Sequence, residues 1–250
     1  MSASASHGFV LHRHDYRDTS LLVELFCVGR GRLPAVARGA RRARSGGRAA
    51  LLQPFQPLWL ELGGRGEVRT LTRVEAVGRP YALAGRALLC GFYVNELLLR
   101  LLGREDPHDA LLDDYQVALA ALAAGDDLEP VLRRFELRLL DALGYGLALD
   151  VETATGRPVR ATADYVFEPE QGLRAATATD DPRLCCRGAT LQALAADAAP
   201  ADAAPADAER AREARALLRA MLAPHLGERP LRTRALFQQW YGGRERSSPH

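Results

Sequence analysis

Hydrophobic and polar positions alternate with a period of two through residues 8–75, which predicts short β-strands. The clearest alternation covers residues 67–74, directly after the glycine-rich turn at 63–66. Further strands are predicted at 8–13, 21–26, 31–37 and 57–62, and Pro34 places the third of these at an edge or a bulge. Five short strands with tight turns suit a small closed barrel, for which an OB-fold and an SH3-like barrel are both solutions.

From residue 82 the hydrophobic period becomes helical. Residues 82–102 predict a helix that is apolar nearly all round, which we expect at the centre of an all-helical core. Residues 151–187 are turn-rich, with a possible hairpin at 164–167 and 172–174. Further helices are predicted at 110–124, 128–143, 189–196, 209–223 (ended by Pro224) and 233–240.

The change of period near residue 80 divides the chain. We predict an α+β protein with a five-stranded OB-like barrel at residues 1–80 and a mainly helical domain at 81–242. The helical domain carries a small irregular or β insert at about 151–187, and residues 200–205 form a low-complexity connector. The polar tail at 243–250 is expected to be disordered.

Composition and charge narrow the class of protein. A hydrophobic content of 48% with 26% charged residues is typical of a folded globular chain. Apolar runs are broken by charge too soon to span a bilayer, and the N-terminus lacks the pattern of a secretory signal, so we expect a cytoplasmic protein with no membrane association. Residues 1–80 carry thirteen arginines against six acidic residues, a net +7, whereas residues 81–150 carry six against twelve, a net −6. This polarity predicts two modules with different partners.

The basic charge is concentrated at residues 28–48, which hold seven arginines, with no acidic residue between Glu24 and Glu61. A nucleic-acid backbone would neutralise such a segment, because each guanidinium fork can hold phosphate oxygens. The alternative is a solvated basic loop without a ligand. Tyr16 is the candidate exposed ring for base stacking, whereas Phe9, Phe26 and Trp59 are assigned to the barrel core. The candidate DNA-binding residues are Arg13, Arg30, Arg32, Arg38, Arg41, Arg42, Arg44, Arg48 and Tyr16.

No catalytic constellation or nucleotide-binding loop is present in the sequence, so we predict no catalytic residue and no cofactor. The acidic pairs at 113–114 and 126–127 fit helix starts or solvated faces better than metal ligands. His12 and His14 share one face of a strand but lack a third ligand. Cys27 and Cys90 are expected to be buried, and the adjacent pair at 185–186 cannot easily hold one metal ion.

Taken together, several short motifs resemble the bacterial DNA repair and recombination-mediator family RecO. They occur in family-like order and spacing from residue 9 to about residue 240, which makes the combination specific although each motif alone is weak. The matching stretches are residues 9–12, 36–41, 52–58, 63–68, 93–98, 132–137, 143–146 and 229–234.

The resemblance implies an N-terminal OB-fold, a helical domain and a non-enzymatic role in the cytoplasm, associated with the nucleoid. It implies binding of single- and double-stranded DNA, annealing of complementary strands, and work with a RecR-type partner to replace single-stranded-DNA-binding protein with RecA recombinase. Some members carry a four-cysteine zinc site after the motif at 143–146. Residues 147–158 contain no cysteine here, so we expect no metal and an insert held by packing.

The resemblance also implies binding of the acidic C-terminal tail of single-stranded-DNA-binding protein. Such a peptide needs an apolar groove with a guanidinium at its edge. Arg133, Arg134 and Phe135 are the candidates, with at most one arginine facing the groove. Two other functions stay open: a metal-dependent nuclease using the carboxylates of residues 105–129, and a protein-only adaptor with an acidic partner.

Overall fold

The computed structural model describes residues 4–42, 47–169, 171–197 and 208–241. The chain packs into two compact units: Met1–Asp126 together with Pro230–His250, and Asp127–Arg229. This division by packing falls later than the boundary predicted near residue 80, which marks a change of hydrophobic period. The connector at 200–205 and the tail at 243–250 lie outside the described residues.

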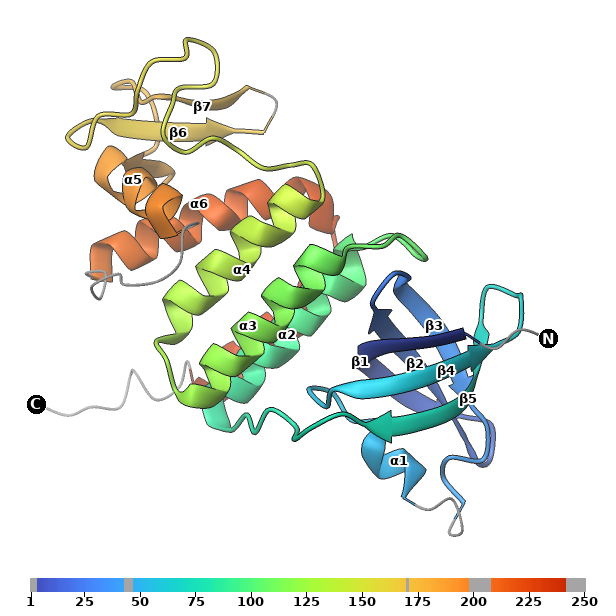
Figure 1. Cartoon of the computed structure of the whole chain (residues 1–250). Coiled ribbons are helices and arrows are strands. Elements are labelled where there is room, and N and C mark those ends of the chain that lie inside the picture. The colour runs from blue at the N-terminus through green and yellow to red at the C-terminus, as the bar shows by residue number, and fades with distance from the viewer. Residues whose placement is uncertain (1–3, 43–46, 170, 198–207, 242–250) are drawn as a thin grey trace, which may run out of the picture. The chain divides into compact units, whose positions relative to one another are not determined.

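Five strands of the first unit close into a barrel in the order β1-β2-β3-β5-β4 (Figure 1). The contact between β3 and β5 is parallel and pairs only Ala35 and Val36 with β5, which fits a strand that contains Pro34. The closed five-stranded barrel confirms the predicted OB-like fold. The strands are β1 (Ser4–Tyr16), β2 (Ser20–Cys27), β3 (Gly31–Ala37), β4 (Leu58–Gly63) and β5 (Arg69–Ala76).

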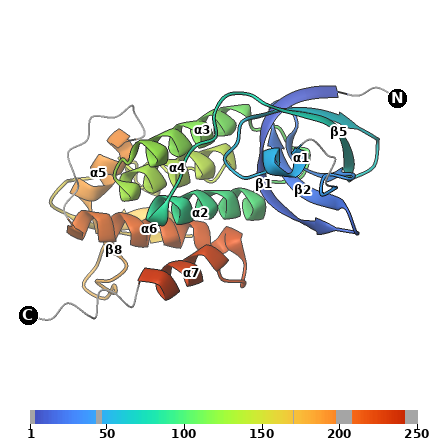
Figure 2. The ribbon, with the colours of Figure 1, turned by 90° about the horizontal axis from the view of Figure 1, so that it is seen from below.

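The barrel core is built from alternate residues of the strands, because successive side chains of a strand point to opposite faces. On β2 these are Leu21, Val23, Leu25 and Cys27, all nearly inaccessible to solvent. A short helix that the sequence did not predict, α1 (Arg48–Leu51), packs its apolar side chains against this core at the mouth of the barrel (Figure 2).

The assignment of three aromatic residues to the barrel core is wrong. Phe9 and Phe26 are buried cross-strand partners, but they alternate with the inward positions and so lie on the outer face of the barrel. The ring of Phe9 instead makes an edge contact with that of Tyr115, with centroids 5.2 Å apart. Trp59 is half-buried, and the guanidinium of Arg73 lies 5.4 Å from its ring centroid.

The first unit also contains α2 (Gly85–Leu101), α3 (Asp109–Ala124) and α7 (Arg232–Tyr241). We expected the first of these helices in an all-helical core, but α2 packs against strand β1 as well as against α3 and α7. Asn95 on α2 is buried, and its side-chain nitrogen donates to the carbonyl oxygen of Leu11 on β1 at 2.9 Å. The core around α2 is therefore mixed.

The second unit consists of three helices and a small sheet with strand order β7-β6-β8. The hairpin of β6 (Asp164–Glu168) and β7 (Gly172–Ala175) confirms the predicted one, whereas the three-residue strand β8 (Cys185–Arg187) was not predicted. The helices are α4 (Leu128–Ala142), α5 (Gly188–Asp197) and α6 (Ala208–Leu226). Pro224 does not end α6 as predicted, because it removes a single hydrogen bond in the last turn and the helix runs to Leu226.

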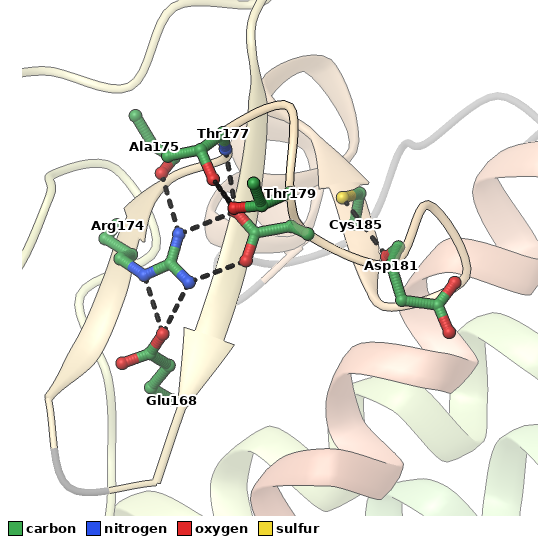
Figure 3. Close-up of polar contacts among 8 residues, drawn as sticks. Glu168, Arg174, Ala175, Thr177, Thr179, Asp181 and Cys185 are labelled. Atoms are coloured by element: carbon green, nitrogen blue, oxygen red, sulfur yellow. Dashed lines mark hydrogen bonds and ion pairs between the residues drawn. The ribbon is translucent and has the colours of Figure 1, made fainter.

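The segment between β7 and β8 is fastened by one arginine (Figure 3). Arg174 donates to the two carboxylate oxygens of Asp180 at 2.9 and 2.7 Å and to Glu168 at 2.7 Å. Asp180 also accepts from the backbone nitrogen and the hydroxyl of Thr177, at 2.7 and 2.8 Å. The hydrogen bond with Asp180 raises the pKa of Arg174, and the same bond lowers the pKa of Asp180.

Apolar packing supports the same insert, as predicted. Tyr165, Leu173 and Cys186 are almost completely buried. The hydroxyl of Tyr165 accepts a hydrogen bond from the backbone nitrogen of Arg160 at 2.9 Å. Packing and the ion network around Arg174 together hold the insert, and the ion network was not foreseen.

Candidate nucleic-acid interface

Two loops of the barrel meet where β1 turns into β2 and where β3 ends. The backbone nitrogen of Arg41 donates to the carbonyl oxygen of Thr19 at 2.9 Å, and its guanidinium pairs with Asp15 at 3.0 Å. Ala40 is fully buried in the barrel core, and Gly39 has a φ of +65°, which glycine adopts without strain. The loop that follows β3 is therefore anchored at its centre, and its arginines lie on either side of that anchor.

Arg38 and Arg42 are exposed, and neither guanidinium forms a hydrogen bond or an ion pair with another residue that the structure describes. The side chain of Arg41 is 38% exposed, and its partner Asp15 is 68% exposed. A pair so open to water contributes about 0–1 kcal/mol, so a phosphate could replace Asp15 at low cost. All three forks are thus accessible to an anion.

Tyr16 lies beside these arginines, at the end of β1. Its ring is half-buried rather than fully exposed, and the guanidinium of Arg17 lies 5.3 Å from the ring centroid. Arg17 is exposed and has a φ of +52°, as the turn requires. Sequence reasoning missed Arg17, although its place next to Tyr16 in a strand-to-turn stretch was a usable signal. We call Tyr16, Arg17, Arg38, Arg41 and Arg42 the exposed arginine cluster.

Four other predicted DNA-binding arginines are turned toward the protein. Arg13 donates to the carbonyl oxygens of Ala49 and Leu52, at 2.8 and 3.3 Å. Arg48 donates to the carbonyl oxygen of Leu71 at 2.5 Å, and burial lowers its pKa. These bonds brace α1 against the barrel.

The remaining two predicted arginines that the structure describes sit near the turn between β2 and β3. Arg32 donates to the carbonyl oxygen of Leu102 at 3.0 Å and pairs with Glu24 at 3.2 Å. Arg30 donates to the hydroxyl of Ser4. Arg44 lies outside the described residues.

The predicted peptide-binding residues lie on α4. Arg133 is 8% exposed and pairs with the buried carboxylate of Glu136 at 2.9 Å, while its Nε has no hydrogen-bond partner among the described residues. Phe135 is 2% exposed, and Arg134 is half-buried. The structure therefore places Arg133 and Phe135 in the interior and leaves Arg134 as the most accessible of the three.

Within the described residues, no three histidine, cysteine, aspartate or glutamate side chains are grouped so that they could hold a metal ion. Asp127 instead caps α4, since its side chain accepts from the backbone nitrogen of Glu129 at 3.3 Å. The rings of His12 and His14 lie 6.0 Å apart on β1, as the strand period predicts. No helix among the described residues is long and apolar enough to cross a membrane.

Comparison with known proteins covers nearly the whole chain. The family described as Recombination protein O N terminal matches residues 1–79, and that described as Recombination protein O C terminal matches residues 83–235. The protein named DNA repair protein RecO of Nitrosospira multiformis is 44% identical over 237 residues, which cover 94% of this chain and 95% of that protein. Proteins with the same name from Halorhodospira halophila and Pseudomonas aeruginosa are each 47% identical over 236 residues, 94% of this chain and 97% and 95% of theirs.

Proposed function

Because this chain belongs to the RecO family of DNA repair proteins, we propose that it binds single- and double-stranded DNA and anneals complementary strands. In this role it acts without catalysis, in the cytoplasm and in association with the nucleoid. It also helps to replace single-stranded-DNA-binding protein on a coated strand with the RecA recombinase.

The exposed arginine cluster is the observation that supports this function most directly. Its arginines come from two loops whose backbones are joined by the hydrogen bond between Arg41 and Thr19, so the two loops are held together before a ligand arrives. Arg38 and Arg42 have no ion pair with a described residue, so binding a phosphate breaks no internal contact. Such contacts hold a backbone without reading bases, which suits a protein that must accept any sequence.

Annealing of complementary labelled oligonucleotides tests the proposal. Purified protein is mixed with the two strands in the absence of ATP and of divalent metal, and energy transfer between the labels reports duplex formation. The proposal predicts that the protein accelerates duplex formation and that a chelator has no effect. Strands that anneal no faster than they do without the protein would contradict the proposal.

The same mixture distinguishes the other two functions. Cleavage of either strand that depends on a divalent ion would support a nuclease. Binding of an acidic peptide without any binding of DNA would support an adaptor. Neither is favoured, because Asp127 is engaged as a helix cap and the cluster has the charge and the aromatic ring of a strand-binding surface.

We further propose two protein partners, a RecR-type protein and the acidic C-terminal tail of single-stranded-DNA-binding protein. For the tail, α4 is the candidate element. The unpartnered Nε of Arg133 could donate to a terminal carboxylate, and Arg134 lies at the accessible side of the same helix. Phe135 is buried, so docking of the tail at this helix requires the side chains packed over its ring to move aside.

A fluorescent tail peptide, titrated against the Arg133→Ala and Arg134→Ala variants, tests the site. Removing Arg133 breaks its buried ion pair with Glu136, so DNA affinity serves as the control for folding. Weaker peptide binding with unchanged DNA affinity supports the site. If both variants bind the peptide as the unsubstituted protein does, the tail docks elsewhere.

A further inference from the structure

Helix α7 (Arg232–Tyr241) presents a stripe of cationic and apolar side chains that the functions above do not use. Arg232, Leu236 and Trp240 are spaced four residues apart, which places them on the same side of the helix. Leu236 is 38% exposed and Trp240 is 58% exposed, the latter unusual for so large an apolar ring. The helix contains no acidic residue.

The start of α7 is fixed to α2 by a carboxylate. Glu96 accepts hydrogen bonds from the backbone nitrogens of Arg232 and Thr233, at 2.8 and 2.9 Å, and from the hydroxyl of Thr233 at 2.6 Å. Figure 2 shows α7 running alongside α2, with its other side turned away. The stripe is therefore held in a set position on the first unit, and it does not depend on the helix N-terminus for charge, because Glu96 already satisfies those backbone groups.

The cationic end of the stripe lies near His12 of the barrel. The rings of His12 and His14 lie 6.0 Å apart on β1, and Arg232 is close enough to His12 to act on it electrostatically. Burial, His14 and Arg232 all lower the pKa of His12, while Glu24 opposes them. A lowered pKa leaves His12 neutral near pH 7, so Arg232 supplies the positive charge at this end of the stripe and the imidazole offers a ring N–H as a hydrogen-bond donor.

We propose that Arg232, Leu236 and Trp240, together with His12 and His14, form a second binding surface for single-stranded nucleic acid. Arg232 holds a phosphate through its charge, ring N–H groups of His12 and His14 donate hydrogen bonds to the backbone, and the ring of Trp240 stacks on a base beside Leu236. The stripe is about 12 Å long, comparable to roughly three nucleotides of a stacked strand. This inference rests on the proposed function, for which a second strand must be held near the first.

Charge complementarity favours a nucleic acid over a protein partner. The stripe has a guanidinium at one end, no carboxylate on its helix, and a large aromatic ring, and this combination is typical of sequence-tolerant strand binding. Because the exposed arginine cluster is formed by other loops of the barrel, the two surfaces can be removed separately by substitution.

Fluorescence of Trp240 tests the surface, because the chain has only two tryptophans. In a Trp59→Phe variant all tryptophan emission comes from Trp240. Titration with an oligothymidylate should quench that emission saturably, as base stacking requires, and an Arg38→Ala/Arg42→Ala change in the same background should preserve the quenching. A Trp59→Phe variant that binds the labelled oligonucleotide, by anisotropy, without any change in Trp240 emission would overturn the inference and leave the proposed function standing.

A matched pair of substitutions on one helix sharpens the test. Arg232→Ala removes the cation of the stripe, whereas Arg234→Ala removes an exposed cation two positions away, which faces another side of α7. Arg232→Ala should lower the affinity measured by quenching and reduce the slope of log affinity against log salt by about 0.7. Arg234→Ala should change neither quantity. Equal effects of the two variants would overturn the inference, as would quenching by an acidic peptide but not by the oligonucleotide. No binding of DNA at all would overturn the proposed function as well.

Discussion

The hydroxyl of Tyr115 on α3 donates to the side-chain oxygen of Asn95 on α2 at 2.8 Å, and both side chains are buried. Asn95 in turn donates to the carbonyl oxygen of Leu11 on β1, so one amide joins two helices to the barrel. Burial raises the pKa of Tyr115, which keeps the hydroxyl protonated as a donor. This link explains why α2 and α3 belong to the same compact unit as the strands.

Two substitutions in this link should differ in cost. Tyr115→Phe removes one neutral hydrogen bond and should lower the free energy of unfolding by about 1 kcal/mol. Asn95→Ala leaves two buried groups without partners and creates a small cavity, so it should cost about 3 kcal/mol. Urea titration followed by tryptophan fluorescence measures both, since Trp59 and Trp240 both belong to this unit. Tyr81→Phe is the control, and equal costs for all three variants would contradict the account.

A glycine pair tests the contact between the turn after β2 and the segment before α3. Gly29 and Gly31 have φ of +66° and +65°, so alanine at either position should cost about 1 kcal/mol of left-handed strain. Only at Gly31 would an added methyl group collide with the backbone carbonyl of Asp106, whereas the space at Gly29 is open. Gly31→Ala should therefore cost about 1–3 kcal/mol more than Gly29→Ala in the same urea titration. Identical midpoints would show that the two segments do not pack closely.

The ion network around Arg174 predicts how the insert responds to protease. Asp180→Ala should speed tryptic cleavage after Arg183, because the loop loses the four hydrogen bonds that Asp180 accepts. Asp150→Ala is the control, since it removes an exposed carboxylate of the same unit that makes no hydrogen bond or ion pair with another described residue. Mass spectrometry of timed digests identifies the cut, and equal rates for the two variants would contradict the role of Asp180.

Acid should weaken the same network. The pKa of Asp180 is lowered in the folded chain, so its stabilising effect is present above its ordinary pKa of 3.8 and declines as the pH falls below that value. Amide hydrogen exchange in residues 176–184, corrected for intrinsic rates, should therefore show less protection at low pH in the unsubstituted protein. In Asp180→Ala, protection should depend less on pH in that range, because only the pair of Arg174 with Glu168 remains.

Thiol accessibility supplies a further prediction. Cys27, Cys90 and Cys186 are buried, which confirms the expectation for the first two, while Cys185 is half-buried. Burial raises the pKa of Cys27 and Cys186 to about 12, so neither thiol is ionised at mildly alkaline pH. A chromogenic disulfide reagent should react with one thiol in the folded protein and with four after unfolding. If one thiol of the folded Cys185→Ser variant still reacts rapidly with the reagent, Cys185 is not the accessible thiol and the prediction is wrong.

The sequence predicted the barrel and the long helices because each has a clear hydrophobic period. It missed α1 and β8, which are too short to show one. Trp59 was misplaced because the preference of aromatic residues for cores was weighed above strand alternation, which puts Leu58 and Leu60 inside. The prediction that Pro224 ends α6 was wrong because a proline in the last turn of a helix removes only one hydrogen bond.

The candidate site was predictable only in outline. Charge density located the basic segment, but it could not separate a guanidinium that braces the protein from one that faces water. Arg13 and Arg48 donate to backbone carbonyls of segments distant in sequence, while Arg38 and Arg42 do not. That difference depends on tertiary placement, and no local pattern of residues encodes it.

The central claim is that the exposed arginine cluster binds the DNA backbone. Affinity for a labelled single strand should be measured against salt concentration for Arg38→Ala/Arg42→Ala and for Arg157→Ala/Arg183→Ala, a control with the same change of charge at exposed positions of the second unit. We expect the first variant to bind more weakly and to lose about 1.4 from the slope of log affinity against log salt, and the control to match the unsubstituted protein. Equal affinities and slopes for the two variants would contradict the claim.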